Sequence, residues 1–441
     1  MSLAELVFAA GVVGAGGAGF PTHKKLTGSA RLLVANGAEC EPLLASDRYV
    51  MRHEAAEVIA GLEAIRRELG CPEAVIGLKR TYVREIAALE AAIAAQGAAV
   101  SLHLVDSFYP AGDEQTLIFE ITGQTVPPGG LPLALGIVVV NVTTARNVAF
   151  ARRGEPVTRR LVTVNGAVRR PAVVDAPVGT TAADLVDAAG GTTAGAAVFV
   201  QGGPLMGAYH PWSDAASLGF GKANGGLVVL PAQHRLALQA AKPVERIIRE
   251  AQSACIQCQA CTDLCPRHLI GHRLRPHRVM RAAGTEEAVL LDPLLCCECG
   301  ICELIACPMG LSPRRVIQYA KGALRASGAR LDGPAAAVWP EQQAGRPGRR
   351  IAQSRLVAHL GLDGYPGQVD DLVVCEPSRV AIPLRHGAGR PARPVVAAGD
   401  EVTAGQVIAA VGPDEVGCLV HASIGGRIAE VAPGFIAIER K

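Results

Sequence analysis

Two stretches of sequence decide the fold of the middle of this chain: CIQCQACTDLCP at residues 255–266 and CCECGICELIACP at residues 296–308. In each stretch, three cysteines are spaced by two residues, and a fourth stands directly before a proline. These eight positions account for most of the 13 cysteines in the chain. In a reducing compartment, such regular spacing favours metal ligation over disulfide bonds.

Three thiolates at this spacing wrap around an iron–sulfur cubane on one short loop, and in two-cluster ferredoxins the fourth cysteine ligates the other cluster. This crossing predicts one 4Fe–4S cluster on Cys255, Cys258, Cys261 and Cys307, and a second on Cys296, Cys299, Cys302 and Cys265. The second stretch has one extra residue before its last cysteine, which loosens the match without removing a ligand. Two structural zinc sites are the alternative, but zinc usually takes well-separated CxxC pairs.

The remaining cysteines have simpler expected roles. Cys297 adjoins a predicted ligand but is out of register, so we expect it to be a bystander. Cys71, Cys375 and Cys418 are expected to be small buried hydrophobes. Two clusters in one small domain imply one-electron transfer, so the rest of the chain should supply a site for an electron donor or acceptor.

The length of 441 residues suggests several domains, because domains average about 150 residues. The net charge of +3 and the aromatic content of 4% give no reason to expect a nucleic-acid partner. The charge-free stretch 121–145 is broken by prolines, and its apolar part, 133–140, is too short to span a bilayer as a helix. The first residues carry Glu5 and no basic segment, unlike a secretory signal. We therefore expect a cytoplasmic protein with no membrane span.

The first domain, residues 1–153, is expected to be α/β. Short apolar runs at 32–36, 74–78, 100–105 and 136–142 predict strands, and the stretches 54–69 and 82–96 predict helices between them. Strands that alternate with helices favour a largely parallel sheet.

The rest of the chain divides by composition into four further parts. Residues 154–236 are rich in Val, Thr and Gly around a short helix near 181–189, which predicts a small α+β domain. Residues 237–327 form the helical two-cluster domain. Residues 328–370 begin with a Gly-, Pro- and Arg-rich run that predicts a linker. Residues 371–441 show short strands separated by glycine turns, which predicts a small β barrel or sandwich.

A glycine-rich loop near the N-terminus, GAGGAGFPT at residues 14–22, precedes Lys24 and Lys25. Glycines let the backbone approach a phosphate closely, and a lysine beyond them adds a positive charge. By itself the loop is equally consistent with a plain turn, since it lacks the preceding strand of a dinucleotide fingerprint. Three further motifs accompany it: NGAECEP at 36–42, YPAGDEQ at 109–115 and NVTT at 141–144.

Together these four motifs resemble the flavin-binding domain shared by RnfC and the flavin subunit of respiratory complex I, over residues 5–150. The resemblance implies that FMN binds here and accepts hydride from NADH as substrate, and that electrons then leave singly through the clusters. The resemblance also implies roles for single residues. The phosphate and ribityl region would be cradled by Gly14, Gly16 and Lys25, and the flavin would be lined by Asn36, Gly112, Glu114 and Asn141. Glu39 would lie where NADH approaches, Phe20 would stack on the nucleotide, and the cofactor site would be completed by Gly17, Gly19 and Thr144.

Two of these residues also have simpler interpretations, which are less favoured: Glu39 as a helix cap and Phe20 as a core residue. One departure from the family matters as well. Complex I has an aspartate at the position of Ala38, so polar contacts to the flavin are expected to be rearranged.

The flanking modules carry further resemblances. Residues 157–207 resemble the SLBB, ubiquitin-like module that follows the flavin domain in the same families, and a packing role is expected for it. The tail resembles the barrel-sandwich hybrid of lipoyl and biotinyl domains. Its hairpin, HASIGG at 421–426, has no lysine, so covalent attachment of lipoate or biotin is not expected.

The fold class is thus multidomain α/β and α+β, with a C-terminal barrel-sandwich hybrid. In RnfC this hybrid stands before the flavin loop, whereas here it stands at the C-terminal end. That order, and the spacing of the second cysteine stretch, are similar to the PduS family of cobalamin reductases. This resemblance implies a cobalamin or corrinoid system as electron acceptor, and location in a bacterial microcompartment.

Two other functions remain open from the sequence. One is an electron-entry subunit of a membrane complex, as in RnfC, and the other is an electron-conducting module bound to microcompartment shell proteins. The basic segment 267–278 is expected to be a solvated helix, with partner docking or cobalt ligation as alternatives, and we place no cobalt ligand there.

Overall fold

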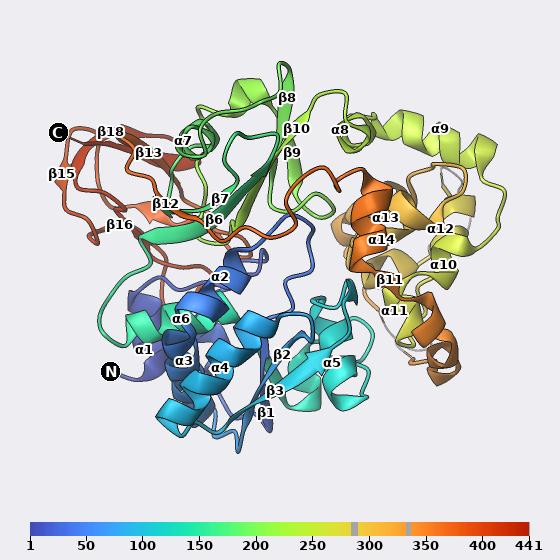
Figure 1. The fold of residues 1–441 in the computed structure, drawn as a ribbon, viewed down its shortest axis with the longest axis horizontal. Helices are drawn as coiled ribbons and strands as arrows, with labels where there is room; N and C mark the ends of the chain where they lie inside the picture. Colours follow the sequence, from blue (N-terminus) through green and yellow to red (C-terminus); the bar gives the residue numbers. More distant parts are fainter. Residues whose placement is uncertain (284–289, 332–336, 441) are drawn as a thin grey trace.

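The computed structural model describes residues 1–283, 290–331 and 337–440. Four modules follow one another along the chain (Figure 1): an α/β domain, a mixed six-stranded sheet, a helical cysteine-rich domain and a C-terminal barrel. The cysteine-rich domain and the barrel lie at opposite ends of the long axis. Within these ranges, no helix has the length and apolar character needed to cross a bilayer.

The N-terminal domain is built on a parallel sheet with the strand order β3-β2-β1-β5. Its strands, close to the predicted ranges, are β1 (Leu32–Asn36), β2 (Ala74–Lys79), β3 (Val100–Val105) and β5 (Ile137–Asn141). The chain adds β2 and β3 on one side of β1, and then β5 on the other. The winding therefore reverses between β1 and β5, and open parallel sheets bind ligands at the carboxyl ends of strands at such a switch point.

Helices cover both faces of this sheet, because successive side chains of each strand point to opposite faces. Leu33 and Ala35 of β1 share a core with residues of the helix layer, whereas Leu32 and Val34 pack with residues of one helix on the other face. The first layer contains α1 (Leu3–Ala9), α2 (Ser46–His53), α3 (Ala55–Glu68), α4 (Val83–Gln96) and α6 (Val142–Ala151), and the second contains α5 (Glu114–Thr122). Burying each Leu or Val contributes about 1.5–3 kcal/mol, so this two-sided core is a main source of the domain's stability.

Three short elements of this domain complete its loops: the 3-10 helices η1 (Thr22–Lys25) and η2 (Pro132–Leu135), and β4 (Phe108–Tyr109).

The second module is a mixed sheet with the order β12-β7-β6-β10-β8-β9. It contains β6 (Arg159–Gly166), β7 (Ala172–Pro177), β8 (Ala197–Gln201), β9 (Ala208–Pro211) and β10 (Gly226–Pro231), with helix α7 (Ala182–Ala188) and the 3-10 helix η3 (Trp212–Asp214). Its edge strand β12 (Leu372–Val374) pairs in parallel with β7. The first strand of the predicted C-terminal domain therefore belongs to this sheet. The sequence did not predict this pairing, because a three-residue strand gives no indication of which strand it pairs with.

The cysteine-rich domain consists of short helices joined by the two cysteine loops. They are α8 (Arg235–Ala240), α9 (Val244–Ala254), α10 (Ala260–Asp263), α11 (Pro266–Leu269), α12 (Pro276–Arg281), η4 (Asp292–Leu295), the π-helix η5 (Cys302–Ala306) and α13 (Pro313–Ala326). The loops use left-handed backbone conformations at Gln257, Gln259 and Glu298. Such conformations let a short loop curl so that several side chains face one centre.

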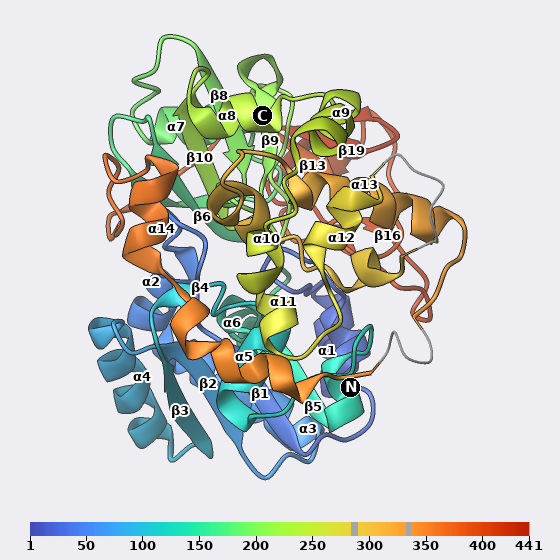
Figure 2. The same cartoon turned by 90° about the vertical axis from the view of Figure 1, so that its right-hand side faces the viewer.

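The segment from 337 to 370 is not the loose linker that composition predicted. It forms η7 (Pro340–Gly345), η8 (Pro347–Arg349), β11 (Ile351–Ala352) and α14 (Gln353–Leu360), and β11 pairs with β4. Arg350 pairs with Glu120 of α5 and lies 4.7 Å from the ring centre of Phe108. Figure 2 shows the segment running from the cysteine-rich domain along the side of the N-terminal domain. Arg346 and Arg350 thus contact the N-terminal domain through Glu120.

The C-terminal barrel has two sheets, β13-β19-β18-β15 and β14-β16-β17. The strands are β13 (Arg379–Pro383), β14 (Arg393–Pro394), β15 (Glu401–Val402), β16 (Val407–Ala410), β17 (Val420–His421), β18 (Gly426–Val431) and β19 (Phe435–Glu439). Inward-facing Val and Ile side chains from both sheets form one core, which Phe8 of α1 joins from outside. The barrel is therefore packed against the N-terminal domain.

Candidate functional site

The predicted flavin residues gather at the switch point of the parallel sheet. Asn36 and Asn141 are direct partners in the β1–β5 register, each at the carboxyl end of its strand. The Asn141 side chain caps α6 by accepting the backbone N–H of Thr143 (2.9 Å), and it donates to Asp47 (2.6 Å). The two asparagines therefore lie side by side at the edge where a ligand of such a sheet binds.

The glycine loop, residues 14–20, is held beside Asn141. The N–H of Ala15 donates to the hydroxyl of Thr144 (2.8 Å), and the carbonyl of Ala15 accepts from Arg160 of β6 (3.0 Å). Thr144 and Arg160 are both buried, whereas Gly16, Gly17 and Ala18 are exposed. A Cβ on Gly17 would meet nothing within 4 Å. The loop is thus pinned at its base and open at its tip.

A charged pair lies on the other side of the site. The ammonium group of Lys25 donates to the carbonyl of Val139 (2.8 Å) and lies 3.9 Å from the carboxylate of Glu114. It is also 5.8 Å from the ring centre of the half-buried Phe20. Burial raises the pKa of Glu114, and the nearby Lys25 opposes that rise. Lysine, carboxylate and aromatic ring are therefore accessible together.

Gly112 lies in contact with the loop after β1. Its carbonyl accepts from the Asn36 amide (2.8 Å), and a Cβ at Gly112 would come within 2.2 Å of the Ala38 carbonyl. Glycine is required here because two loops touch backbone to backbone. Ala38, the departure from the complex I pattern, is buried under this contact and offers no polar side chain.

Glu39 caps a helix, as its simpler interpretation predicted. Its carboxylate accepts from the hydroxyl of Ser46 (3.3 Å) and from the N–H groups of Asp47 and Arg48 (3.4 Å each) at the start of α2. Burial, and then the nearby Asp47, raise the pKa of Glu39 to about 7. A carboxyl whose pKa is raised to about 7 therefore lies next to the switch point.

Two predicted residues act from beneath the surface. Thr144 is buried and supports the glycine loop, and Gly19 is buried against the C-terminal barrel. The accessible set that remains fits a phosphate-bearing flavin. An exposed glycine tip and a lysine suit the phosphate, and two asparagines and a carboxyl suit the polar edge of the ring.

The eight regularly spaced cysteines form two groups. Cys255, Cys258, Cys261 and Cys307, the first thiol group, line one small cavity together with apolar side chains that include Ile256, Met280 and Leu311. Burial raises the pKa of Cys261 to about 12, and the three other sulfurs of the group add to this rise. The group joins three cysteines of one stretch to the last cysteine of the other, which is the predicted crossing.

The second thiol group, Cys265, Cys296, Cys299 and Cys302, is more deeply placed. Burial raises the pKa of Cys302, and Cys296 and Cys265 raise it further. The N–H of Glu298 donates to the Cys296 sulfur (3.2 Å), and Lys321 donates to the Cys296 carbonyl (2.7 Å). Donors directed at cysteine sulfur are typical of iron–sulfur loops.

The first thiol group fits a cubane. Its four thiols surround one small cavity whose other lining is largely apolar. A 4Fe–4S cluster held by four cysteine thiolates suits such a lining.

Two polar contacts join the loop that carries Gly112 and Glu114 to the segments that carry the second thiol group. The Tyr109 hydroxyl, fully buried, donates to the Cys299 carbonyl (2.7 Å). Arg267 pairs with Asp113 (2.8 Å), which is adjacent to Gly112 and caps α5. The two sites are therefore linked through residues of the YPAGDEQ motif.

The basic segment 267–278 is largely buried, so the prediction of a solvated helix is wrong for its first half. Arg267, His268 and His272 are each under 10% exposed. The His272 ring donates to the Val126 carbonyl (3.0 Å), and burial lowers its pKa to about 4. The basic groups serve the contact between two domains, which sequence reasoning on one segment does not reveal.

Some residues of the site were not assigned from sequence. Glu41 accepts the N–H groups of Leu205 (2.9 Å) and Met206 (3.0 Å), and burial raises its pKa to about 7. Glu41 and Tyr109 lie in the motifs quoted above, so the sequence offered a way to identify them. Arg160 lies in a strand of the next module, and no sequence motif indicated its role.

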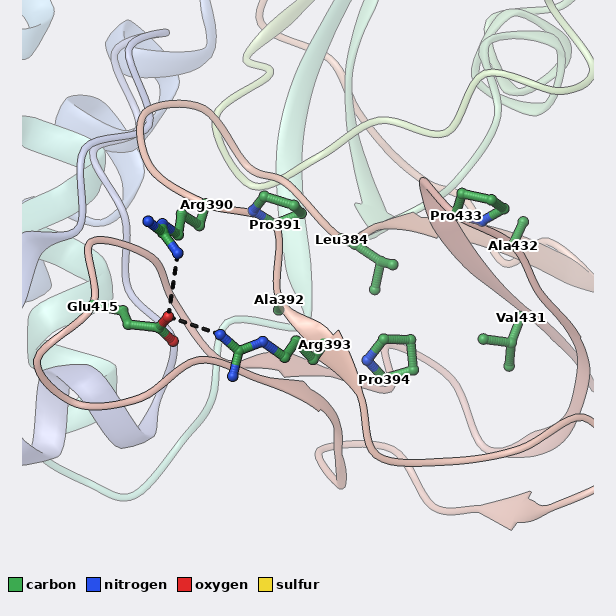
Figure 3. A pocket seen from close by; sticks show the side chains of 10 residues that line it. All are labelled: Leu384, Arg390, Pro391, Ala392, Arg393, Pro394, Glu415, Val431, Ala432 and Pro433. Carbon is green, nitrogen blue, oxygen red and sulfur yellow. Dashed lines mark hydrogen bonds and ion pairs between the residues drawn. The ribbon is translucent and has the colours of Figure 1, made fainter.

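A cavity of about 540 Å³ lies away from this site, in the barrel. Figure 3 shows Arg390 and Arg393 at its side, both paired with Glu415 (3.9 and 2.9 Å). No predicted site residue lines it. Because the Glu415 carboxylate pairs with both arginines, we assign this cavity no part in the chemistry.

Four family models match the chain in the same order as the modules. They are the Nuo51 FMN-binding domain over residues 7–150, the SLBB domain over 161–208, the 4Fe-4S dicluster domain over 254–312 and the RnfC barrel sandwich hybrid domain over 372–441. In the solved NAD+-reducing NiFe hydrogenase in its H2-reduced state, a chain 21% identical in sequence aligns with a TM-score of 0.51, over 76% of this chain and 68% of that one. That likeness concerns the fold.

Two curated relatives match over nearly the whole length. The cobalamin reductase PduS of Salmonella typhimurium is 41% identical, covering 99% of this chain and 96% of the relative. The cobalamin reductase PduS of Citrobacter freundii is 39% identical, covering 100% and 96%. With an FMN-binding domain, a 4Fe–4S dicluster domain and this full-length similarity, the chain belongs to the PduS family of flavo-iron–sulfur oxidoreductases.

Proposed function

We propose that the chain is an NADH-dependent cobalamin reductase that uses FMN and two 4Fe–4S clusters. The observation that carries the proposal is the contact between the flavin edge and the second thiol group through Tyr109 and the Asp113–Arg267 pair. Internal electron transfer requires the flavin site and a cluster site to lie close together in the folded chain. The name of the two relatives supports cobalamin as acceptor.

In this proposal the open glycine tip and Lys25 bind the FMN phosphate, and Asn36 and Asn141 orient the ring. Bound FMN supplies the chemistry that converts a two-electron hydride transfer into single-electron steps. One NADH oxidised to NAD+ then balances two one-electron reductions of cobalamin. Glu39 lies beside the path of the incoming dinucleotide, and its protonation sets the local charge.

The burial of the two thiol groups gives the transfer a direction. The second group contacts the flavin domain through Cys299 and is the inner one. The first group includes the exposed Cys258, and the neighbouring Ile256 and Met309 are 61% and 47% exposed. The first group is therefore the exit, where a corrinoid or its carrier protein would approach.

An anaerobic optical titration of the cluster-reconstituted protein with NADH tests the proposal. We expect NADH to bleach both the flavin bands and the iron–sulfur absorption, and added cob(III)alamin to reverse the bleaching. The double variant Gly16→Asp with Lys25→Ala should lose FMN and NADH-driven bleaching, because it places a negative charge at the phosphate and removes a positive one.

Gly28→Asp is the control: a side chain at Gly28 meets open space, and its φ of +89° makes this substitution no easier on the backbone than the one at Gly16. Bound flavin that NADH does not reduce would rule out the donor assignment. Reduced protein that cob(III)alamin does not reoxidise would instead favour another acceptor, such as a carrier docked to a microcompartment shell.

A further inference from the structure

The C-terminal barrel touches the glycine loop directly. The barrel loop, residues 385–390, runs alongside the loop tip, and the N–H of Ala388 donates to the Ala18 carbonyl (2.9 Å). The contact joins chain segments about 370 residues apart and reaches the exposed part of the predicted phosphate cradle. The barrel is thus part of the surroundings of the flavin site.

Glycines on both sides make this contact possible. A Cβ on Gly19 would come within 1.9 Å of the His386 carbonyl, and a Cβ on Gly387 would come within 2.5 Å of the Ala18 carbonyl. Both glycines have positive φ, +61° and +122°. Neither backbone can therefore carry a side chain without separating the two loops.

A buried lysine of the second module fixes the barrel loop from behind. The Lys222 ammonium donates to the carbonyls of Gly11 and Leu419, at 2.8 Å each, and so ties the turn between α1 and the glycine loop to the barrel. The Lys222 N–H donates to Nδ1 of His386 (3.2 Å). Lys222 is only 2% exposed, and its two hydrogen bonds offset part of the cost of burying the ammonium group.

We propose that the barrel loop is a latch that holds the tip of the glycine loop in its phosphate-binding shape; the part concerning FMN rests on the function proposed above. Thr144 and Arg160 fix the loop at Ala15, and Ala388 fixes it at Ala18. Only Gly16 and Gly17 remain between these fixed points. A tip held in this way binds a phosphate without first losing conformational freedom, which strengthens binding.

Gly387→Ala tests the latch, with Gly166→Ala as a matched control. Gly166 ends strand β6 of the second module with φ +89°, and a Cβ there would come within 2.1 Å of the Val229 carbonyl. Both substitutions thus add one methyl group at positive φ against a carbonyl oxygen. Only Gly387 faces the glycine loop.

FMN affinity is measured by flavin fluorescence on the full chain, and amide hydrogen exchange is followed in residues 14–20. We expect Gly387→Ala to weaken FMN binding by about tenfold or more and to speed exchange in the loop, because a left-handed alanine against a carbonyl displaces the latch. Gly166→Ala should leave both within about twofold while lowering the melting temperature similarly. Equal effects of the two variants, or none from Gly387→Ala, would overturn the latch.

A second variant covers the case in which Gly387→Ala does not fold. His386→Ala removes the acceptor for the Lys222 N–H, and His386→Asn supplies an amide oxygen close to the position of Nδ1. We expect the first to speed loop exchange and the second to restore it. If wild-type protein bound no FMN, the function proposed above would fail, whereas the exchange measurements would still decide the latch.

Discussion

Replacing Thr144 by valine tests the flavin site most sharply. The change keeps the size and branching of the side chain but removes the hydroxyl that accepts the Ala15 N–H (2.8 Å). Thr144 is 1% and Ala15 3% exposed, so water cannot take over the lost contact. One of the contacts that pin the glycine loop would be gone.

The magnitude follows from that burial. A buried N–H left without a partner costs about 1–3 kcal/mol. The loop can lower this cost by moving, and FMN must then restore the native shape when it binds. If the whole cost appears in binding, FMN affinity falls by about 5- to 150-fold, since 1.4 kcal/mol is a factor of ten.

The assay is an equilibrium titration of apo-protein with FMN, followed by fluorescence quenching. Thr163→Val is the matched control, because the Thr163 hydroxyl also accepts a buried alanine N–H, that of Ala45 (2.9 Å), away from the glycine loop. We expect Thr144→Val alone to weaken FMN binding. Unchanged affinity in Thr144→Val, or equal losses in both variants, would refute the placement of FMN on this loop.

Three other predictions concern the clusters and the donor. Under the crossed ligand arrangement, Cys258→Ala and Cys307→Ala should leave the same residual EPR spectrum of the reduced protein, and Cys265→Ala should leave a different one; a match between Cys258→Ala and Cys265→Ala would exclude the crossing. Burial raises the pKa of Glu39 to about 7, so this carboxyl is neutral below that pH and charged above it. The KM for anionic NADH should therefore rise as the pH passes 7 in the wild-type protein, and it should not change with pH in Glu39→Gln. The same pH profile in both proteins would remove Glu39 from the donor site. Tyr109→Phe should slow cluster reduction more than flavin reduction in stopped-flow traces, because it loses the bond to the inner thiol group, and equal slowing would contradict that role.

The sequence predicted well whatever depends on local spacing. The strands at 32–36 and 100–105 and the helix at 54–69 appear in the structure within a residue or two, because period and turn residues are local signals. The grouping of Cys307 with the first stretch also follows from spacing, since the crossing is a property of the loop pattern. The predicted order of four modules agrees with the four family models that match the chain.

Contacts between modules were the part that could not be predicted. Arg267 and Arg350 belong to segments whose composition indicates exposure, yet each pairs with a carboxylate of the N-terminal domain, Asp113 and Glu120. A charged residue is buried when a partner neutralises it, and the partner here is more than 150 residues away. No property of the segment itself contains that information.

The same reasoning explains why Glu39 had two interpretations that are both compatible with the structure. A carboxylate that caps α2 is fixed in position by three donors, and burial near Asp47 raises its pKa to about 7. A cap on an exposed helix would keep an ordinary carboxyl, because water would solvate its charge. The free-energy cost of burying this charge is explained more simply if the carboxyl also meets an arriving ligand. The pH profile of KM in Glu39→Gln distinguishes a carboxyl that only caps α2 from one that also faces NADH.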